Sequence, residues 1–136
     1  MTATVLDASA LLAFLDAEPG DETAARQIDG ALMASVNYSE VLRWVIQGGV
    51  SQDVAAPMLG ELGFGVVPVD KHAAEVAAKL RLETKELGLS LAECCCLALG
   101  IIKGGCVLTA DPALAEAKLP VKVKLVRHRP AKAGKR

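Results

Sequence analysis

The chain contains 136 residues, of which 52% are hydrophobic and only 3% aromatic, and its formal net charge is −1. This length fits one domain that buries its own core without disulfide or metal support. No apolar run reaches the ~20 residues of a membrane span, and no basic region precedes an apolar one at the N-terminus, so we expect a cytoplasmic protein that does not enter a membrane.

Strands and helices alternate along the chain. Short apolar runs predict the strands, and apolar residues that recur at three- and four-residue steps predict the helices. In chain order we expect a strand at 3–7, helices at 9–15 and about 22–30, a strand at 32–36, helices at about 40–47 and 51–62, a strand at 65–69, helices at 71–87 and 91–102, a strand at 106–109, a helix at 112–117 and a strand at 121–126. The alternation predicts an α/β fold, with a parallel sheet of four or five strands covered on both faces.

No internal repeat or linker divides the chain. We expect a single domain over residues 1–128 and a basic, disordered C-terminal tail over residues 129–136. From Lys118 onward the chain has eight Lys and Arg residues and no acid, whereas the preceding 117 residues hold all 16 acids and seven bases. Such a segment is typical either of a polyanion-binding region or of a solvated tail that aids solubility.

Several element boundaries depend on single residues. Pro68 predicts an edge position for its strand, because proline cannot donate a hydrogen bond to a neighbouring strand. Asp21 and Asp70 are expected to cap the helices that follow them. Ser90 and Glu93 form a capping box before a nearly unbroken apolar helix, which we expect to be central and buried. The helix at 71–87 is expected to turn Ala74, Ala77, Ala78 and Leu82 toward the core.

Four carboxylates follow or flank the predicted strand ends. Asp7 ends the first strand, Asp111 follows the strand at 106–109, and Glu40 and Glu93 lie in the first turns of helices. Because the carboxyl ends of parallel strands share one edge, Asp7, Glu40 and Asp111 should lie together, and Glu93 joins them if its helix packs beside the first strand. Each acid also has a structural interpretation, as a helix cap, a capping-box partner or a charge that favours a helix N-terminus.

Carboxylates gathered in one place need compensation. Two charges 4 Å apart repel by ~4 kcal/mol at an effective dielectric constant of 20. A hard divalent cation such as Mg²⁺ or Mn²⁺ prefers oxygen ligands and activates water for attack on a phosphodiester. Zinc fits poorly, because Cys94, Cys95, Cys96 and Cys106 lack zinc-ligand spacing and His72 and His128 are expected in solvent. The cysteines are expected to be small buried hydrophobes.

Four blocks in the chain are Val5-Leu6-Asp7-Ala8-Ser9-Ala10-Leu11-Leu12, then Ser39-Glu40-Val41, then Gly88-Leu89-Ser90-Leu91-Ala92-Glu93 with Cys96-Leu97-Ala98-Leu99, and Leu108-Thr109-Ala110-Asp111. In this order and spacing they resemble the signature of PIN-domain ribonucleases, and most of all the VapC-type toxins of toxin–antitoxin pairs. The resemblance implies an α/β/α sandwich, Mg²⁺- or Mn²⁺-dependent endonucleolytic cleavage of RNA, a homodimer and inhibition by a cognate antitoxin.

The resemblance also assigns roles to single residues. It implies that Asp7, Glu40, Glu93 and Asp111 are the catalytic metal ligands. It also places the hydroxyls of Ser9 and Thr109 beside them, where they could orient water or a carboxylate, and capping explains the two hydroxyls equally well. Glu93 departs from the family, which usually has Asp at this position. Its side chain reaches farther by one C–C bond, ~1.5 Å.

Two alternative functions fit part of this pattern. In haloacid-dehalogenase-like phosphatases an Asp in the position of Asp7 is a covalent nucleophile, but a second Asp stands two residues on, where this chain has Ser9. The other alternative is a PIN-like binding module, catalytically weak or inactive, that acts through a protein partner, and Glu93 keeps it open.

Two further surfaces are expected outside the acidic edge. With few aromatic residues for base stacking, RNA affinity should come from contacts to the backbone by Arg43, Lys79, Arg81 and the tail. The early helices carry many apolar residues, which serve the core by default and could also form a dimer or antitoxin interface. These residues are Leu11, Leu12, Phe14, Leu15, Val41, Leu42, Trp44 and Val45.

Overall fold

The computed structural model describes residues 2–16 and 22–126 of the chain. In chain order its elements are β1 (Thr4–Leu6), α1 (Ala8–Leu15), α2 (Glu22–Ile28), β2 (Leu32–Ala34), α3 (Ser35–Gln47), α4 (Gln52–Gly60), β3 (Gly65–Val67), α5 (Lys71–Glu83), a 3₁₀ turn (Lys85–Leu87), α6 (Leu91–Ile102), β4 (Cys106–Thr109), α7 (Pro112–Glu116) and β5 (Lys122–Leu125). The basic tail expected at 129–136, the solvated His128 and the cap expected at Asp21 lie outside the described residues.

The strands form one five-stranded parallel sheet in the order β3-β2-β1-β4-β5. The edge position of β3 confirms the prediction from Pro68, which follows the strand directly. From β1 the chain builds outward through β2 to β3, then crosses back to β4 on the other side of β1. In open parallel sheets, ligands bind at the carboxyl ends of the strands where the order reverses, here between β1 and β4.

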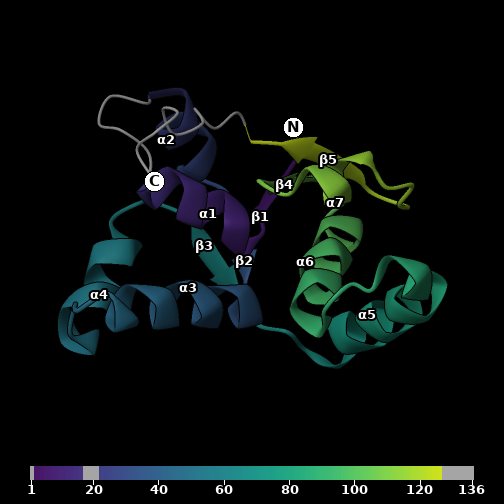
Figure 1. The fold of residues 1–136 in the computed structure, drawn as a ribbon, viewed down its shortest axis with the longest axis horizontal. Coiled ribbons are helices and arrows are strands. Elements are labelled where there is room, and N and C mark those ends of the chain that lie inside the picture. The colour runs from purple at the N-terminus through teal and green to yellow at the C-terminus, as the bar shows by residue number, and fades with distance from the viewer. Residues whose placement is uncertain (1, 17–21, 127–136) are drawn as a thin grey trace, which may run out of the picture.

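Helices cover both faces of the sheet. Successive strand residues point to opposite faces, and both sets are buried. Leu6, Met33 and Leu108 pack with α1, α2, α3 and α4, whereas Val5, Ala34 and Val107 pack with α5, α6 and α7. Figure 1 shows the two helical layers on either side of the sheet. The predicted parallel sheet with helices on both faces is confirmed.

Helix α3 begins at Ser35, about five residues earlier than the sequence predicts. The pairing of β2 with β3 stops at Ala34 and Val67, and the next residue, Pro68, has no N–H with which to extend the ladder. Instead, the hydroxyl of Ser35 accepts the backbone N–H of Val69 at 3.2 Å. The predicted place of Glu40 in the first turn of its helix is therefore wrong, because it lies in the second turn.

Helix α5 differs from the prediction in its length and in the face that it buries. It ends at Glu83, and the 3₁₀ turn leads to Gly88, which ends the segment with a φ of 64°. The buried residues are Ala73, Ala77 and Leu80, whereas Leu82 is 76% exposed. Two residues along a helix rotate a side chain by about 200°, so Leu80 and Leu82 point to opposite sides.

Helix α6 follows the prediction closely. Ser90 and Glu93 form the predicted capping box, and all residues from Cys94 to Gly100 are buried.

None of the helices in residues 2–16 and 22–126 combines the length and the apolar character needed to cross a membrane.

Candidate functional site

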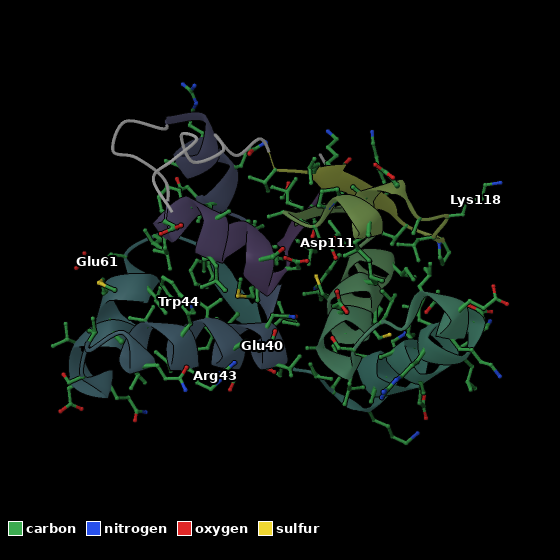
Figure 2. The ribbon with its side chains drawn as sticks, in the orientation of Figure 1. Glu40, Arg43, Trp44, Glu61, Asp111 and Lys118 are labelled. Carbon is green, nitrogen blue, oxygen red and sulfur yellow. The ribbon has the colours of Figure 1, made fainter. Side chains whose placement is uncertain are left out.

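The four predicted acids line one open cavity of about 260 Å³. Its lining residues are Asp7, Ala8, Ser9, Leu12, Asn37, Glu40, Ser90, Glu93 and Asp111. They come from α1, α3, the start of α6 and the turn before α7. Glu40 on α3 and Asp111 before α7 can be followed in Figure 2. The cavity thus lies beside the carboxyl ends of β1 and β4, where the strand order reverses.

Asp7 is held by three hydrogen-bond donors and is only 5% exposed. Its Oδ1 accepts from the Ser9 hydroxyl at 2.5 Å and from the Ala10 N–H at 3.0 Å, and its Oδ2 accepts from Thr109 Oγ1 at 2.7 Å. The bond from Ala10 makes Asp7 the N-cap of α1, so the capping interpretation is confirmed. The same bonds fix the direction in which the carboxylate faces the cavity.

Ser9 and Thr109 tie the ends of β1 and β4 together. While each hydroxyl donates to Asp7, each also accepts a backbone N–H from the turn after β4. Ala110 N donates to Ser9 Oγ at 2.9 Å, and Asp111 N donates to Thr109 Oγ1 at 3.0 Å. The two hydroxyls therefore set the position of Asp7 relative to the backbone of Asp111.

Glu93 and Asp111 each use one oxygen for helix capping. Glu93 Oε1 accepts the Ser90 N–H at 2.8 Å and completes the capping box at the start of α6. Asp111 Oδ1 accepts the Ala113 N–H at 3.0 Å and caps α7. The second oxygen of each carboxylate has no hydrogen-bond partner among the described residues, so it is free to bind a ligand.

Glu40 differs from the other three acids because it caps nothing. It is half-buried in the second turn of α3, a helix without an acidic residue in its first turn. Within residues 2–16 and 22–126, no group donates a hydrogen bond to its carboxylate. The interpretation that Glu40 only favours a helix N-terminus is therefore wrong.

No basic side chain neutralises the cavity in the part of the chain that the structure describes. The single ion pair there joins Lys71 and Glu75 on the exposed side of α5. The donor set is made of oxygen atoms only, which fits Mg²⁺ or Mn²⁺ and not zinc. However, no group of three or more Asp, Glu, His or Cys side chains in these residues is already arranged to hold a metal ion. To bind a cation here, the side chain of Glu40 and the free oxygens of Glu93 and Asp111 would have to move toward the ion.

The buried thiols of α6 lie behind the acids. Burial raises the pKa of the Cys96 thiol well above its usual 9.0, and the negative charges of Asp7, Glu93 and Glu40 raise it further. Burial also raises the pKa of Cys94 and Cys95. A thiol in this setting stays protonated and is a poor ligand. The predicted role as small buried hydrophobes is confirmed for these three cysteines, whereas Cys106 in β4 is only partly buried.

Asn37 also lines the cavity, although it is not among the site residues predicted from the sequence. Its side chain is only 2% exposed, and its Nδ2 donates to the carbonyl oxygen of Ala92 in α6 at 3.1 Å. Asn37 and Glu40 are three residues apart, so they share a helix face once α3 begins at Ser35. That spacing would have identified Asn37 if the start of the helix had been placed correctly.

The chain matches the PIN domain family over residues 4–119, which include all four acids of the cavity. No curated protein matches it. A chain of a toxin–antitoxin complex from Klebsiella pneumoniae is similar at 18% identity and a TM-score of 0.68, and the match covers 92% of this chain and 97% of that chain. A chain of DNA-bound VapBC from Salmonella typhimurium is similar at 14% identity and a TM-score of 0.71, with 92% of this chain and 98% of that chain covered. A chain of VapBC-5 from Mycobacterium tuberculosis is similar at 24% identity and a TM-score of 0.61, with 93% of this chain and 99% of that chain covered.

At these identities the solved structures share the fold with this chain. PIN domains are generally nucleases that use divalent metal ions. The family match extends from β1 past α7 and so covers the cavity and four of the five strands. The chain therefore belongs to the PIN domain family.

Proposed function

We propose that this protein is a metal-dependent endoribonuclease that hydrolyses RNA phosphodiester bonds in the cytoplasm as the VapC-type toxin of a toxin–antitoxin pair. The observation that carries the proposal is the cavity in which Asp7, Glu40, Glu93 and Asp111 meet without a basic partner among the described residues. Membership of a family of nucleases supports the reaction type, and the fold shared with chains of VapBC complexes supports the toxin role.

Each residue of the cavity has a part in this function. Asp7, Glu40, Glu93 and Asp111 would hold Mg²⁺ or Mn²⁺ through their oxygens, and the cation would offset their mutual repulsion. When bound, the ion supplies a Lewis acid that polarises the phosphate and lowers the pKa of the attacking water. Ser9 and Thr109 keep Asp7 oriented, and Glu40, which caps nothing, is free to turn toward the ion.

RNA would be held by basic side chains outside the cavity. Arg43 is exposed on α3, one turn beyond Glu40, and Lys79 and Arg81 are exposed on α5. Lys and Arg contacts to phosphates supply affinity that does not depend on sequence and that weakens with salt. The acidic cavity itself would admit the scissile phosphate only together with a cation.

A cognate antitoxin and a second copy of the chain are the proposed protein partners. Leu11, Val41 and Val45, which the sequence offered for an interface, are buried in the core. Trp44 on α3 remains 46% exposed, and Met58 on the adjoining α4 is 39% exposed. We expect co-expression with the product of the neighbouring reading frame to yield a stable complex that Trp44→Ser weakens. Size-exclusion chromatography with light scattering would measure both this complex and the homodimer.

The alternative function, a catalytically weak or inactive PIN-like binding module, has two observations in its favour. Glu93 is turned to the Ser90 N–H, and no ready metal-binding group exists among the described residues. Calorimetry with Mn²⁺ distinguishes the two functions, because the nuclease binds the ion and the inactive module does not.

The experiment that tests the nuclease compares Asp7→Asn with Asp70→Asn. Both Asp residues are N-caps whose Oδ1 accepts the N–H of the third residue on, and Asn retains good capping. Only Asp7 lies in the cavity. With RNA and Mg²⁺ or Mn²⁺, we expect Asp7→Asn to lower the cleavage rate by about 100-fold or more and Asp70→Asn to cleave like the wild type. Equal cleavage by the two variants would overturn the assignment.

A further inference from the structure

Asn37 carries a buried oxygen atom that its structural role does not explain. The side chain is 2% exposed, and Nδ2 donates to the Ala92 carbonyl at 3.1 Å. Since a carbonyl only accepts, this bond identifies the nitrogen end of the amide. The remaining atom, Oδ1, is the one buried side-chain nitrogen or oxygen in residues 2–16 and 22–126 that has no hydrogen-bond partner.

A buried polar atom without a partner costs free energy, and native proteins nearly always pair such atoms with protein, water or an ion. Tying α3 to α6 requires only the nitrogen of Asn37. Asn37 lines the same cavity as four carboxylates, and ionised carboxylates accept hydrogen bonds but cannot donate them. Because no described group donates to Oδ1, a cation in this cavity, or a water molecule that the cation holds, would supply the missing partner.

We propose that Asn37 Oδ1 is a neutral fifth oxygen donor of the cation site, directed at the ion or at a water in its inner shell. The inference rests on the proposed function, since it assigns a further residue to the same site. Asn37 lies one turn before Glu40 on α3, and its bond to Ala92 anchors it beside Glu93 on α6. An amide oxygen is an accepted ligand of hard cations, and it adds a donor without adding charge to a cavity that already holds four acids.

The test is the affinity of the full chain for Mn²⁺, measured without RNA by calorimetry or by the electron paramagnetic resonance of the free ion. Asn37→Leu removes both ends of the amide, whereas Asn37→Asp loses the bond to Ala92 but keeps an oxygen in place of Oδ1. We expect Asn37→Leu to weaken Mn²⁺ binding by about 10-fold or more and Asn37→Asp to bind at least as tightly as the wild type. Thr84→Val is the matched control, because the buried Thr84 hydroxyl donates to the carbonyl oxygen of Leu80 and Thr84 does not line the cavity.

A residue that only ties α3 to α6 would give the same Mn²⁺ affinity in both Asn37 variants and in the control, and that result would overturn the proposal. If Asn37→Leu does not fold, the wild type decides. We then expect the side-chain NH₂ resonances of Asn37 to shift when Mg²⁺ saturates the protein, and unshifted resonances would overturn the proposal. A wild-type protein that binds no Mn²⁺ would overturn the proposed function as well, whereas normal binding with unchanged Asn37→Leu affinity overturns this inference alone.

Discussion

Thr109 Oγ1 donates a hydrogen bond to Asp7 Oδ2 at 2.7 Å and joins the carboxyl ends of β4 and β1, which are 102 residues apart in the chain. These two strands are neighbours at the centre of the sheet, where the strand order reverses. The bond that orients a cavity carboxylate is thus also a bond between the two halves of the fold. Changes at this position should affect stability as well as activity.

Thr109→Val is expected to lower the free energy of unfolding by about 1–3 kcal/mol, because it leaves buried Asp7 Oδ2 and the Asp111 N–H without a partner. Urea denaturation measures the change. Thr4→Val, in β1 and outside the hydroxyl network, is the control and should stay within about 0.5 kcal/mol of the wild type. A loss in Thr109→Val no larger than in the control would show that the network contributes little.

Glu93→Gln separates capping from metal binding. Gln serves in a capping box as Glu does, so we expect the stability of α6 and of the whole protein to change by less than about 0.5 kcal/mol. The charge on the cavity falls by one, so Mn²⁺ affinity and RNA cleavage should fall. If Glu93→Gln cleaves RNA at the wild-type rate, Glu93 is only the capping partner of Ser90.

Gly100 in α6 has no room for a side chain. A Cβ placed there would lie 2.7 Å from Val107 Cγ2 and 3.1 Å from Val121 Cγ2. Gly100→Ala should therefore destabilise the protein by about 1–3 kcal/mol through overpacking. Gly60→Ala is the matched change, because nothing lies within 4 Å of its Cβ position at the end of α4, and it should stabilise by up to about 1 kcal/mol. Thermal unfolding of both variants checks the contrast, and equal shifts in Tm would contradict it.

Stability should fall as the pH rises above about 9. Burial raises the pKa of Cys94, Cys95 and Cys96 above the usual 9.0. A group with a higher pKa in the folded than in the unfolded protein stabilises the fold fully below its unfolded pKa, and this contribution is lost as the pH rises through the folded pKa. Urea denaturation with a reducing agent at about pH 7.5 and pH 9.5 measures the loss. The loss of stability between the two pH values should be smaller in Cys96→Ala than in the wild type. An equal loss would contradict the assignment of the pH dependence to the buried Cys96 thiol.

The strands, the caps and the acidic edge could be predicted because they depend on local sequence. An apolar run that ends at Asp7, and a serine three residues before Glu93, signal their structures without knowledge of distant residues. The start of α3 could not be predicted in this way, because β2 ends where Pro68, more than 30 residues later, withholds an N–H. Asn37 was missed for the same reason, since its helix face follows from that start.

Which face of α5 is buried depends on its packing against α6, and the sequence does not show that the two helices are in contact. Ala77 and Leu80 pack in the same cluster as Cys94 to Leu99 of α6, and this contact leaves Leu82 in solvent. The hydrogen bonds between Ser9, Thr109 and Asp7 could not be predicted from the sequence either. The residue types were identified from the sequence, but their pairing required the two ends of the sheet to be placed side by side.

Glu40→Gln tests the central claim most directly. Glu40 lines the cavity but caps no helix and has no hydrogen bond to its carboxylate within the described residues, so its loss should leave the fold intact. Glu61, exposed after α4, is the matched control and is labelled with Glu40 in Figure 2. With Mg²⁺ or Mn²⁺ and RNA, we expect Glu40→Gln to keep the wild-type Tm and to lower the cleavage rate by about 100-fold or more. Glu61→Gln should cleave RNA at the wild-type rate. Wild-type cleavage by a folded Glu40→Gln would contradict the claim that this cavity cleaves RNA.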